Sequence, residues 1–329
     1  MTLVIGTDEA GYGPNLGPLV VAGTVWRIDD DEPSADDPSA SEPADGLDRA
    51  AAALTTALAA AQPDTDGPLW ADSKQVYRGG EGFEPLERGV LAGLLLAGGG
   101  LPPDWPALAA ALGVPPAETA PPEQRQLESL QLPREADGGR CAADAEGVRG
   151  SLGRRRVSLV RMACRVVQPG DFNALLRDGL NKSDILSRIT LDLAAALRAM
   201  AADEPAIIWC DRHGGRKHYA GIVSRHFDAP LVRAIEETAA RSAYALASPP
   251  CRIEFSVGGE SRVPVALASM TAKYVRELAM HAFNAFWSAR LPALRPTAGY
   301  PLDARRWRRD AAAAIQSLGI DDEQLWRRA

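Results

Sequence analysis

The chain has 329 residues, 46% of them hydrophobic, which is enough to bury one large core or two medium ones. Four cysteines without CxxC spacing exclude a disulfide framework and a zinc cluster, and His213 near Cys210 lacks a second pair of ligands. The chain shows no secretory signal pattern and no run of about 18 apolar residues. We therefore expect a cytoplasmic protein that makes no membrane contact.

The net charge of −7 is concentrated in one segment. Residues 29–48 hold nine acids and no Lys or Arg, whereas the rest of the chain carries 34 acids against 36 bases, a net charge of +2. Runs of charge with Pro and Ser bury little apolar area, so we expect an acidic, flexible insertion over residues 29–68. The net charge of the whole chain therefore says little about the charge of the folded surface.

The first half of the chain predicts three strands and two helices. Apolar runs place the strands at residues 2–9, 17–27 and 156–168, and the helices at 47–61 (Ala-rich) and 84–97. Residues 98–153 are rich in Gly, Pro and Ala with weak periodicity, and are interpreted as a second, irregular insertion.

The second half predicts helices alternating with strands. Asn181 or Ser183 can cap a helix whose apolar face carries Leu186, Ile189, Leu193, Leu197 and Met200. A buried strand at 206–209 ends at Asp211, and helices are expected at 263–287 and 303–317. This pattern predicts a single α/β domain over residues 1–329, with a mixed central sheet flanked by helices and with C-terminal helices.

Four acids lie at the ends of strands or just before a helix. Asp8 and Glu9 end the first strand, Asp211 ends an internal strand, and Glu260 precedes the long helix. Adjacent carboxylates raise each other's pKa unless a cation offsets their charge, and hard oxygen ligands suit Mg²⁺ or Mn²⁺. Because functional groups gather at strand ends, we expect these acids to meet and to hold two ions about 3.5–4 Å apart.

Five motifs, in order along the chain, resemble those of the type 2 ribonucleases H, ribonuclease HII and ribonuclease HIII. They are Asp8-Glu9-Ala10-Gly11-Tyr12-Gly13-Pro14 with Gly17-Pro18-Leu19-Val20-Val21, Asp72-Ser73-Lys74, Asn181 with the helix before Asp211, Ala268-Ser269-Met270-Thr271-Ala272-Lys273-Tyr274-Val275-Arg276-Glu277, and Gly299-Tyr300-Pro301. The resemblance covers residues 3–28, 69–76 and roughly 160–318. It implies a ribonuclease H-like fold and metal-dependent endonuclease cleavage of the RNA strand of RNA/DNA hybrids, leaving 3′-hydroxyl and 5′-phosphate ends.

The resemblance implies a role for each matching position. The metal ligands and catalytic residues implied are Asp8, Glu9, Asp211 and Glu260. The substrate-binding residues implied are Gly11, Tyr12, Gly13, Lys74, Lys273 and Tyr300. Glycines let the backbone approach the 2′-OH that distinguishes RNA from DNA, lysines contact phosphates, and an exposed tyrosine stacks on a sugar or base.

Two positions depart from the usual patterns of the family. Tyr12 stands where ribonuclease HII usually has Arg, and a phenol offers one hydroxyl and a stacking face in place of a fork of donors. We therefore expect weaker selection of isolated ribonucleotides. Glu260 matches the fourth acid of ribonuclease HIII, where ribonuclease HII has Asp, but we expect no N-terminal substrate-binding domain of the ribonuclease HIII kind, since the motif starts at Asp8. The combination is what a divergent paralogue would show.

The sequence is compatible with three hypotheses. The first is a monomeric, hybrid-specific endoribonuclease, the second a metal nuclease of the same fold acting on another structured nucleic acid, and the third a catalytically inactive nucleic-acid-binding paralogue. Retention of all four acids argues against the third, because an abandoned metal site would leave unbalanced carboxylates.

Overall fold

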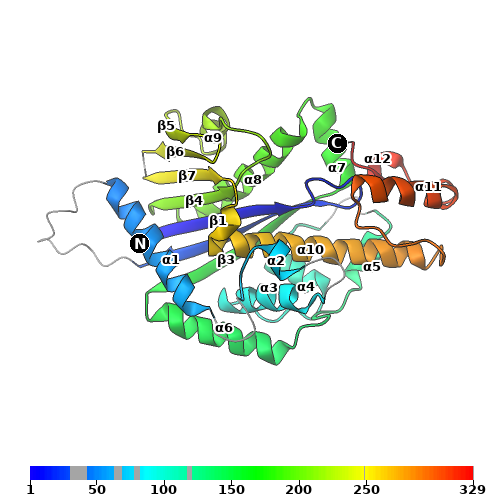
Figure 1. Ribbon diagram of the computed structural model, residues 1–329, viewed down its shortest axis with the longest axis horizontal. Helices are drawn as coiled ribbons and strands as arrows, with labels where there is room; N and C mark the ends of the chain where they lie inside the picture. Colours follow the sequence, from blue (N-terminus) through cyan, green and yellow to red (C-terminus); the bar gives the residue numbers. More distant parts are fainter. Residues whose placement is uncertain (30–42, 63–68, 78–81, 117–120, 248, 329) are drawn as a thin grey trace, which may run out of the picture.

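A mixed β-sheet forms the centre of the molecule (Figure 1). The computed structural model describes residues 1–29, 43–62, 69–77, 82–116, 121–247 and 249–328. In spatial order the strands are β3 (Val157–Val167), β2 (Leu19–Ile28), β1 (Thr2–Ala10), β4 (Ala206–Asp211), β7 (Cys251–Ser256), β6 (Arg241–Leu246) and β5 (Arg233–Glu237). Only the β1–β4 and β4–β7 pairings are parallel among these described strands. The predicted α/β fold with a mixed sheet is confirmed.

Helices cover both faces of the sheet. On one face, α10 (Val263–Ser288) packs with α3 (Glu84–Leu96), and on the other face lies α8 (Lys182–Arg198). Residues of β1 alternate between the two cores: Val4 joins the α10 side, and Leu3 and Ile5 join the α8 side. Because β1 is buried on both faces, it reads as a continuous apolar run.

Further helices complete the layers. They are α1 (Pro43–Ala61), α2 (Ser73–Val76), α4 (Trp105–Ala111), α5 (Gln124–Glu128), α6 (Gly138–Gly153), α7 (Pro169–Arg177), α9 (Ala220–His226), α11 (Pro301–Ser317) and α12 (Asp322–Leu325). The C-terminal helices α11 and α12 pack on the far end of α10, where Trp287 and Trp307 meet edge to face at 5.0 Å. No helix in the described ranges is long and apolar enough to cross a membrane.

The predicted start of α8 is confirmed, but one member of its apolar face is wrong. Asn181 accepts a hydrogen bond from the Asp184 amide at 3.0 Å, and the Asp184 side chain completes a capping box. Leu186 and Leu193 are buried as expected. Met200 is 55% exposed, because α8 ends at Arg198 and a 3₁₀ turn (η1, Ala199–Ala201) turns the chain away.

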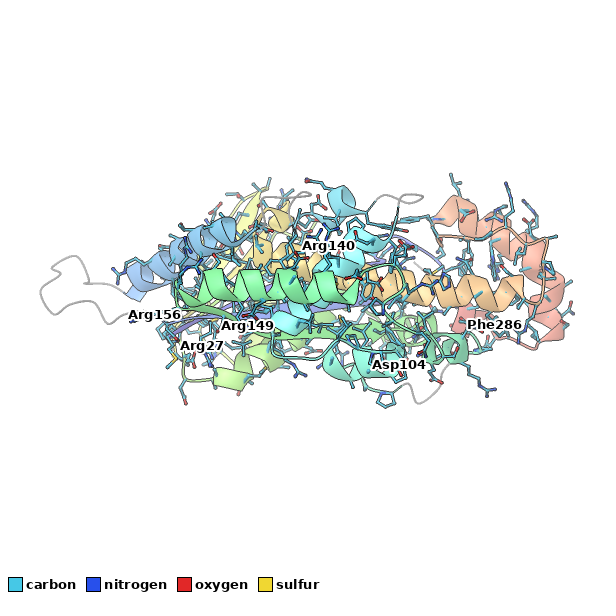
Figure 2. All side chains as sticks on the ribbon, turned by 90° about the horizontal axis from the view of Figure 1, so that it is seen from below. Arg27, Asp104, Arg140, Arg149, Arg156 and Phe286 are labelled. Carbon is cyan, nitrogen blue, oxygen red and sulfur yellow. The ribbon has the colours of Figure 1, made fainter. Side chains whose placement is uncertain are left out.

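The second insertion contains more regular structure than predicted. Residues 98–153 are not irregular, since they form α4, α5 and the 16-residue α6, which lies along the side of the molecule seen in Figure 2. Glycines and small residues hide the periodicity of α6, yet Cys141, Ala145, Val148 and Leu152 are buried on one face. Burial against α3 and α1 supplies the stability that helix propensity does not.

The acidic insertion is not flexible throughout, because the helix predicted at residues 47–61 forms. Residues 43–61 form α1, which buries Leu54 and Leu58, and Asp48 pairs with Arg252 at 2.6 Å. The rest of the expected flexible segment, residues 30–42 and 63–68, lies outside the described residues.

Strands β5, β6 and β7 have no counterpart among the predictions, because charged residues interrupt their apolar pattern. Glu254 of β7 is 1% exposed and would not be expected inside a sheet layer. Three guanidinium groups compensate its charge, with Arg252, Arg241 and Arg262 at 2.8, 3.0 and 2.9 Å. A buried carboxylate surrounded in this way is recognisable only in three dimensions.

The start of α10 lies directly on β1. A Cβ added to Gly6 would come within 2.3 Å of the Pro264 carbonyl carbon, and the Thr24 hydroxyl donates to the Pro264 carbonyl oxygen at 2.8 Å. This close approach fixes the turn before α10 against the carboxyl ends of the parallel strands.

We predict that Gly6→Ala destabilises the protein by about 1–3 kcal/mol, because the methyl group would push Pro264 away from the sheet. Gly147→Ala is the matched control: its Cβ meets nothing within 4 Å in the middle of α6, so it should stabilise by about 0.5–1 kcal/mol. Thermal and denaturant unfolding measure both. Equal stability of Gly6→Ala and wild type would contradict the close approach.

Candidate metal centre

Three of the predicted acids lie at the carboxyl ends of adjacent parallel strands. Thr7 and Cys210 are a register pair of β1 and β4, so the next residues along each strand, Asp8 and Asp211, lie side by side. Side chains alternate between the two faces of a strand, and Val4 and Ile207 pack on the α10 side. Asp8 and Asp211, four residues further along each strand, therefore start from the same face. Glu9, the next residue of β1, starts from the opposite face.

The turn after β7 brings the fourth acid to the same place. Gly258 has a left-handed backbone, with φ of +68°, and Glu260 lies in the short 3₁₀ turn η2 (Gly259–Ser261) before α10. The Gly259 amide donates to Asp211 Oδ1 at 3.0 Å, and a Cβ on Gly259 would lie 3.3 Å from the Asp211 Cα. The predicted convergence of the four acids therefore has a backbone cause.

Burial and neighbouring charge both act on the acids at the strand ends. Asp8 is 5% exposed, and burial, followed by the charges of Glu9 and Asp211, raises its pKa well above the usual value. Burial and then the Asp211 charge raise the pKa of Glu9 to about 7. The pKa of Asp211 is also raised, chiefly by burial, although the Gly259 amide opposes the shift. Like charges are thus held together with too little compensation.

The Asp72-Ser73-Lys74 motif lies beside these acids. Asp72 caps α2 by accepting from the Lys74 amide at 2.9 Å, and this places the Lys74 ammonium 3.0 Å from Glu260 Oε1. Ser73 Oγ lies 2.9 Å from Ser269 Oγ on α10, and the Ser269 hydroxyl hydrogen-bonds Asp8. The motif therefore has a physical role here: it supplies one cation and a hydroxyl relay to the cluster.

The donor set fits a divalent cation. Within the described ranges, no three His, Cys, Asp or Glu side chains are already drawn together as ligands around one point. The four carboxylates nevertheless offer hard oxygen donors, and burial raises the pKa of Asp8, Glu9 and Asp211, with the charges of neighbouring acids adding to each shift. Oxygen ligands of this kind suit Mg²⁺ or Mn²⁺.

The two glycines of the turn after β1 differ in their surroundings: Gly11 is tightly packed, and Gly13 is open. Gly11 has φ of +84°, and a Cβ there would lie 2.5 Å from the Pro18 carbonyl oxygen and 2.6 Å from Arg276 Nε. Gly13 differs, because its added Cβ would meet only the Tyr300 ring, at 3.8 Å, among the described residues. Tyr300 is 52% exposed. The open part of the turn is therefore the Gly13–Tyr300 side.

The two remaining predicted substrate residues flank this region. Lys273 lies one turn after Ser269 on α10, pairs with Glu277 at 2.6 Å and sits 5.3 Å from the centre of the Tyr77 ring. Tyr12 points toward the loop after β4, since a Cβ on Gly214 would lie 3.3 Å from the Tyr12 hydroxyl. Burial and the Glu9 charge raise the pKa of Tyr12, which places its ring near the acids.

Two buried arginines hold the turn: Arg276 belongs to a motif that predicts no such role for it, and Arg327 belongs to none of the motifs. Arg327, which is fully buried, donates to the carbonyl oxygens of Gly11 and Pro14. The Arg327 amide donates to the Asn15 carbonyl at 2.8 Å, and Arg276 donates to the Ala298 carbonyl at 3.0 Å beneath Gly11. An arginine near a chain end carries no signal of such a role, because only the fold brings it to residues more than 300 positions away.

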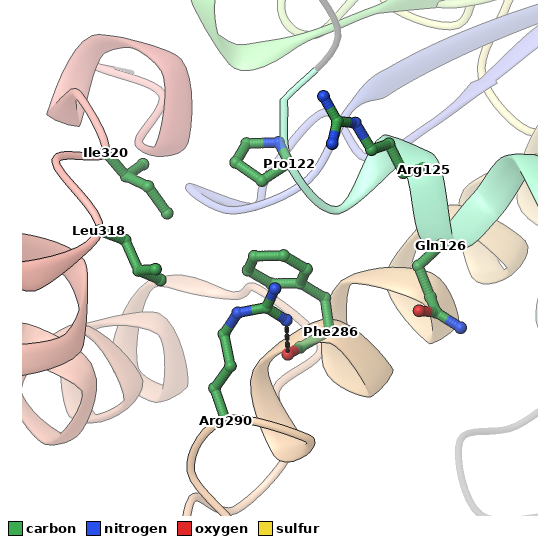
Figure 3. A pocket seen from close by; sticks show the side chains of 7 residues that line it. All are labelled: Pro122, Arg125, Gln126, Phe286, Arg290, Leu318 and Ile320. Carbon is green, nitrogen blue, oxygen red and sulfur yellow. Dashed lines mark hydrogen bonds between the residues drawn. The ribbon is translucent and has the colours of Figure 1, made fainter.

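A cavity at the other end of α10 lies far from the acids. It has a volume of about 420 Å³ and is lined by Pro122, Arg125, Gln126, Phe286, Arg290, Leu318 and Ile320 (Figure 3). The Arg290 guanidinium stacks 3.6 Å from the centre of the Phe286 ring and donates to the Phe286 carbonyl at 2.9 Å. The chain's own arginine thus covers the aromatic face, and none of the four acids is among the lining residues.

Comparisons with known proteins add a distant likeness. No protein-family model and no curated protein matches the sequence. Among solved structures, the ribonuclease HII of the PCNA complex from Archaeoglobus fulgidus aligns with 99% of this chain and 94% of its own, at 14% identity and a TM-score of 0.41.

Two further alignments are of the same kind. Bst ribonuclease HIII in complex with Mn²⁺ aligns with 99% of this chain and 66% of its own, at 18% identity and a TM-score of 0.44. Ribonuclease H2 from Pyrococcus horikoshii OT3 aligns with 98% and 92%, at 14% identity and a TM-score of 0.37. These solved structures belong to the family whose motifs the sequence resembles.

The raised pKa values predict how stability without metal depends on pH. Asp8, Glu9 and Asp211 are easier to protonate in the folded state, so their stabilising contribution is present at low pH and is lost as pH rises through the folded-state pKa, which for Glu9 is about 7. In EDTA, the melting temperature should fall between about pH 5 and pH 8, and less so in Glu9→Gln. Adding Mn²⁺ at the upper pH should restore it. An identical pH profile for the two proteins would contradict the coupled cluster.

We also predict that Arg327→Met loosens the turn that it supports. Two buried carbonyl oxygens would lose their donor, at about 1–3 kcal/mol each. Unfolding experiments should show a clear loss, whereas Arg328→Met, which changes the exposed neighbouring arginine, should stay close to wild type. Equal effects of the two substitutions would show that Arg327 has no special role.

Proposed function

We propose that this chain is a divalent-metal-dependent endonuclease that hydrolyses the RNA strand of RNA/DNA hybrids and leaves 3′-hydroxyl and 5′-phosphate ends. The observation that carries the proposal is the cluster of four interacting carboxylates at the ends of β1, β4 and the β7 turn. The five ordered motifs of the type 2 ribonucleases H support it, because their residues lie around that cluster.

The chemistry depends on the ions that the cluster would hold. Asp8, Glu9, Asp211 and Glu260 would bind Mg²⁺ or Mn²⁺, and two such ions when bound supply a water of lowered pKa and stabilise the leaving oxygen. The chain's residues orient this set: the Gly259 amide holds Asp211 in place, and Ser269 does the same for Asp8. Lys74 offsets part of the negative charge that a phosphodiester would meet on approach.

Recognition of RNA is assigned to the turn next to the acids. The Gly13–Tyr300 side is open, so a ribose can approach the backbone there, and the 2′-OH is the group by which RNA differs from DNA. The half-exposed Tyr300 ring offers a stacking surface for a sugar or base. Lys273 adds a cation on α10 for the strand backbone.

The direct test is incubation of the purified protein with end-labelled RNA/DNA hybrid, duplex DNA with one ribonucleotide, and single-stranded RNA, with Mg²⁺ or Mn²⁺. We expect cleavage of the hybrid, products ending in 3′-hydroxyl, and complete loss in EDTA. Products ending in a 2′,3′-cyclic phosphate, or activity that persists in EDTA, would contradict the mechanism. Cleavage of another structured nucleic acid in place of the hybrid would support the second hypothesis.

Glu260→Gln tests whether Glu260 is a metal ligand or only a negative charge just before α10. We predict an activity loss of at least about 100-fold, because the removal of a group that only supports a metal ligand already costs about 10- to 100-fold. The melting temperature in EDTA should change little, because two effects oppose each other. The substitution removes one ion pair with the exposed Lys74, and it also removes a negative charge that repels the other acids. Glu128→Gln, an exposed carboxylate at the end of α5, is the control and should remain active. Full activity of Glu260→Gln at low Mg²⁺ would remove Glu260 from the site.

A further inference from the structure

Lys182 is a half-buried cation that forms no ion pair with any acid in the described part of the chain. It is the first residue of α8, and its Nζ lies 4.7 Å from the centre of the Tyr12 ring. Burial, followed by the charge of Arg327, lowers the pKa of Lys182, and no described acid opposes this shift. The contact with the ring is therefore the main compensation that the fold gives to this charge.

The other lysines near the site are placed differently. The chain has four lysines among its 36 basic residues, and two of them, Lys74 and Lys273, pair with Glu260 and Glu277. A cation–π contact provides about 0.5–2 kcal/mol and leaves the ammonium donors free. A partly desolvated ammonium with free donors is a good receptor for an anion.

Tyr12 connects this cation with the acid cluster. It stands between Gly11 and Gly13, its hydroxyl lies at Gly214 in the loop after Asp211, and the Glu9 charge acts on it. The ring therefore spans the distance from the acids to Lys182. A strand whose scissile phosphate lies at the acids would carry a neighbouring phosphate past this ring.

We propose that Lys182, supported by the Tyr12 ring, binds a backbone phosphate of the nucleic acid. This phosphate neighbours the scissile phosphate on the same strand. The inference rests on the proposed function and adds a subsite to it. Tyr12 then supports a cation that comes from helix α8. In ribonuclease HII the residue at this position is usually an arginine, which carries the cation on its own side chain.

With only four lysines, each can be observed separately. Reductive methylation with ¹³C-formaldehyde labels every lysine amine and keeps its charge, and the Lys182→Arg variant assigns the Lys182 signal. The probe is a short RNA/DNA hybrid in EDTA, so that binding is observed without cleavage. We expect the Lys74 and Lys182 signals to shift together as the hybrid is added.

Salt dependence of binding gives a second readout. Removing one phosphate contact should reduce the slope of log K against log salt by about 0.7–0.9, so Lys182→Ala should bind the hybrid more weakly with a shallower slope. Lys182→Arg should retain the slope. Arg154→Ala removes an exposed cation at the end of α6 and is the matched control, with the slope expected to match wild type. Melting temperatures of all variants show whether each one is folded.

The outcomes separate the two claims. A Lys182 signal that stays fixed while Lys74 shifts, or an unchanged slope in a folded Lys182→Ala protein, overturns the subsite and leaves the nuclease proposal intact. If no lysine signal responds to the hybrid, either in EDTA or after Mn²⁺ is added, the proposed function fails and the subsite fails with it.

Discussion

The repulsion among four carboxylates is the constraint on which the rest of the structure depends. Parallel pairing of β1, β4 and β7 brings Asp8 and Asp211 side by side, and the turn at Gly258 adds Glu260. The fold buries Asp8 and Asp211 next to other acids, and both groups have raised pKa values. Only rigid surroundings can maintain such an arrangement, and the close contact of α10 with Gly6 provides them.

Around this centre the chain uses positive charge in two different ways. Buried arginines act on the backbone: Arg327 and Arg276 bind carbonyl groups of the glycine turn and its neighbours. Lysines lie closer to the surface, where Lys74 pairs with Glu260 and Lys182 rests on Tyr12. The planar guanidinium suits several fixed carbonyl acceptors at once, whereas the compact ammonium suits an exchangeable anion.

Helix α6, which the sequence pattern did not reveal, is part of the same construction as the predicted helices α1 and α3. Helices α1, α3 and α6 cover the outside of the core beneath α10, and the weak periodicity of α6 is compensated by burial of Cys141 and Leu152. Strand β7 similarly buries the charged Glu254, which is stabilised by ion pairs with three arginines. In both cases tertiary contacts override the local preference of the segment.

The sequence by itself determined the long apolar strands, the capped helix at Asn181, the helix after Glu260 and the place of Asp8, Glu9 and Asp211 at strand ends, because these depend on local patterns and on motifs of contiguous residues. It did not determine strands β5, β6 and β7, helix α6, or the support that Arg327 gives to the turn at Gly11. Those features depend on partners distant in sequence: a charged strand is stable only beside its counterions, a weak helix only against a core, and a buried arginine only beneath the loop that the folded chain brings to it.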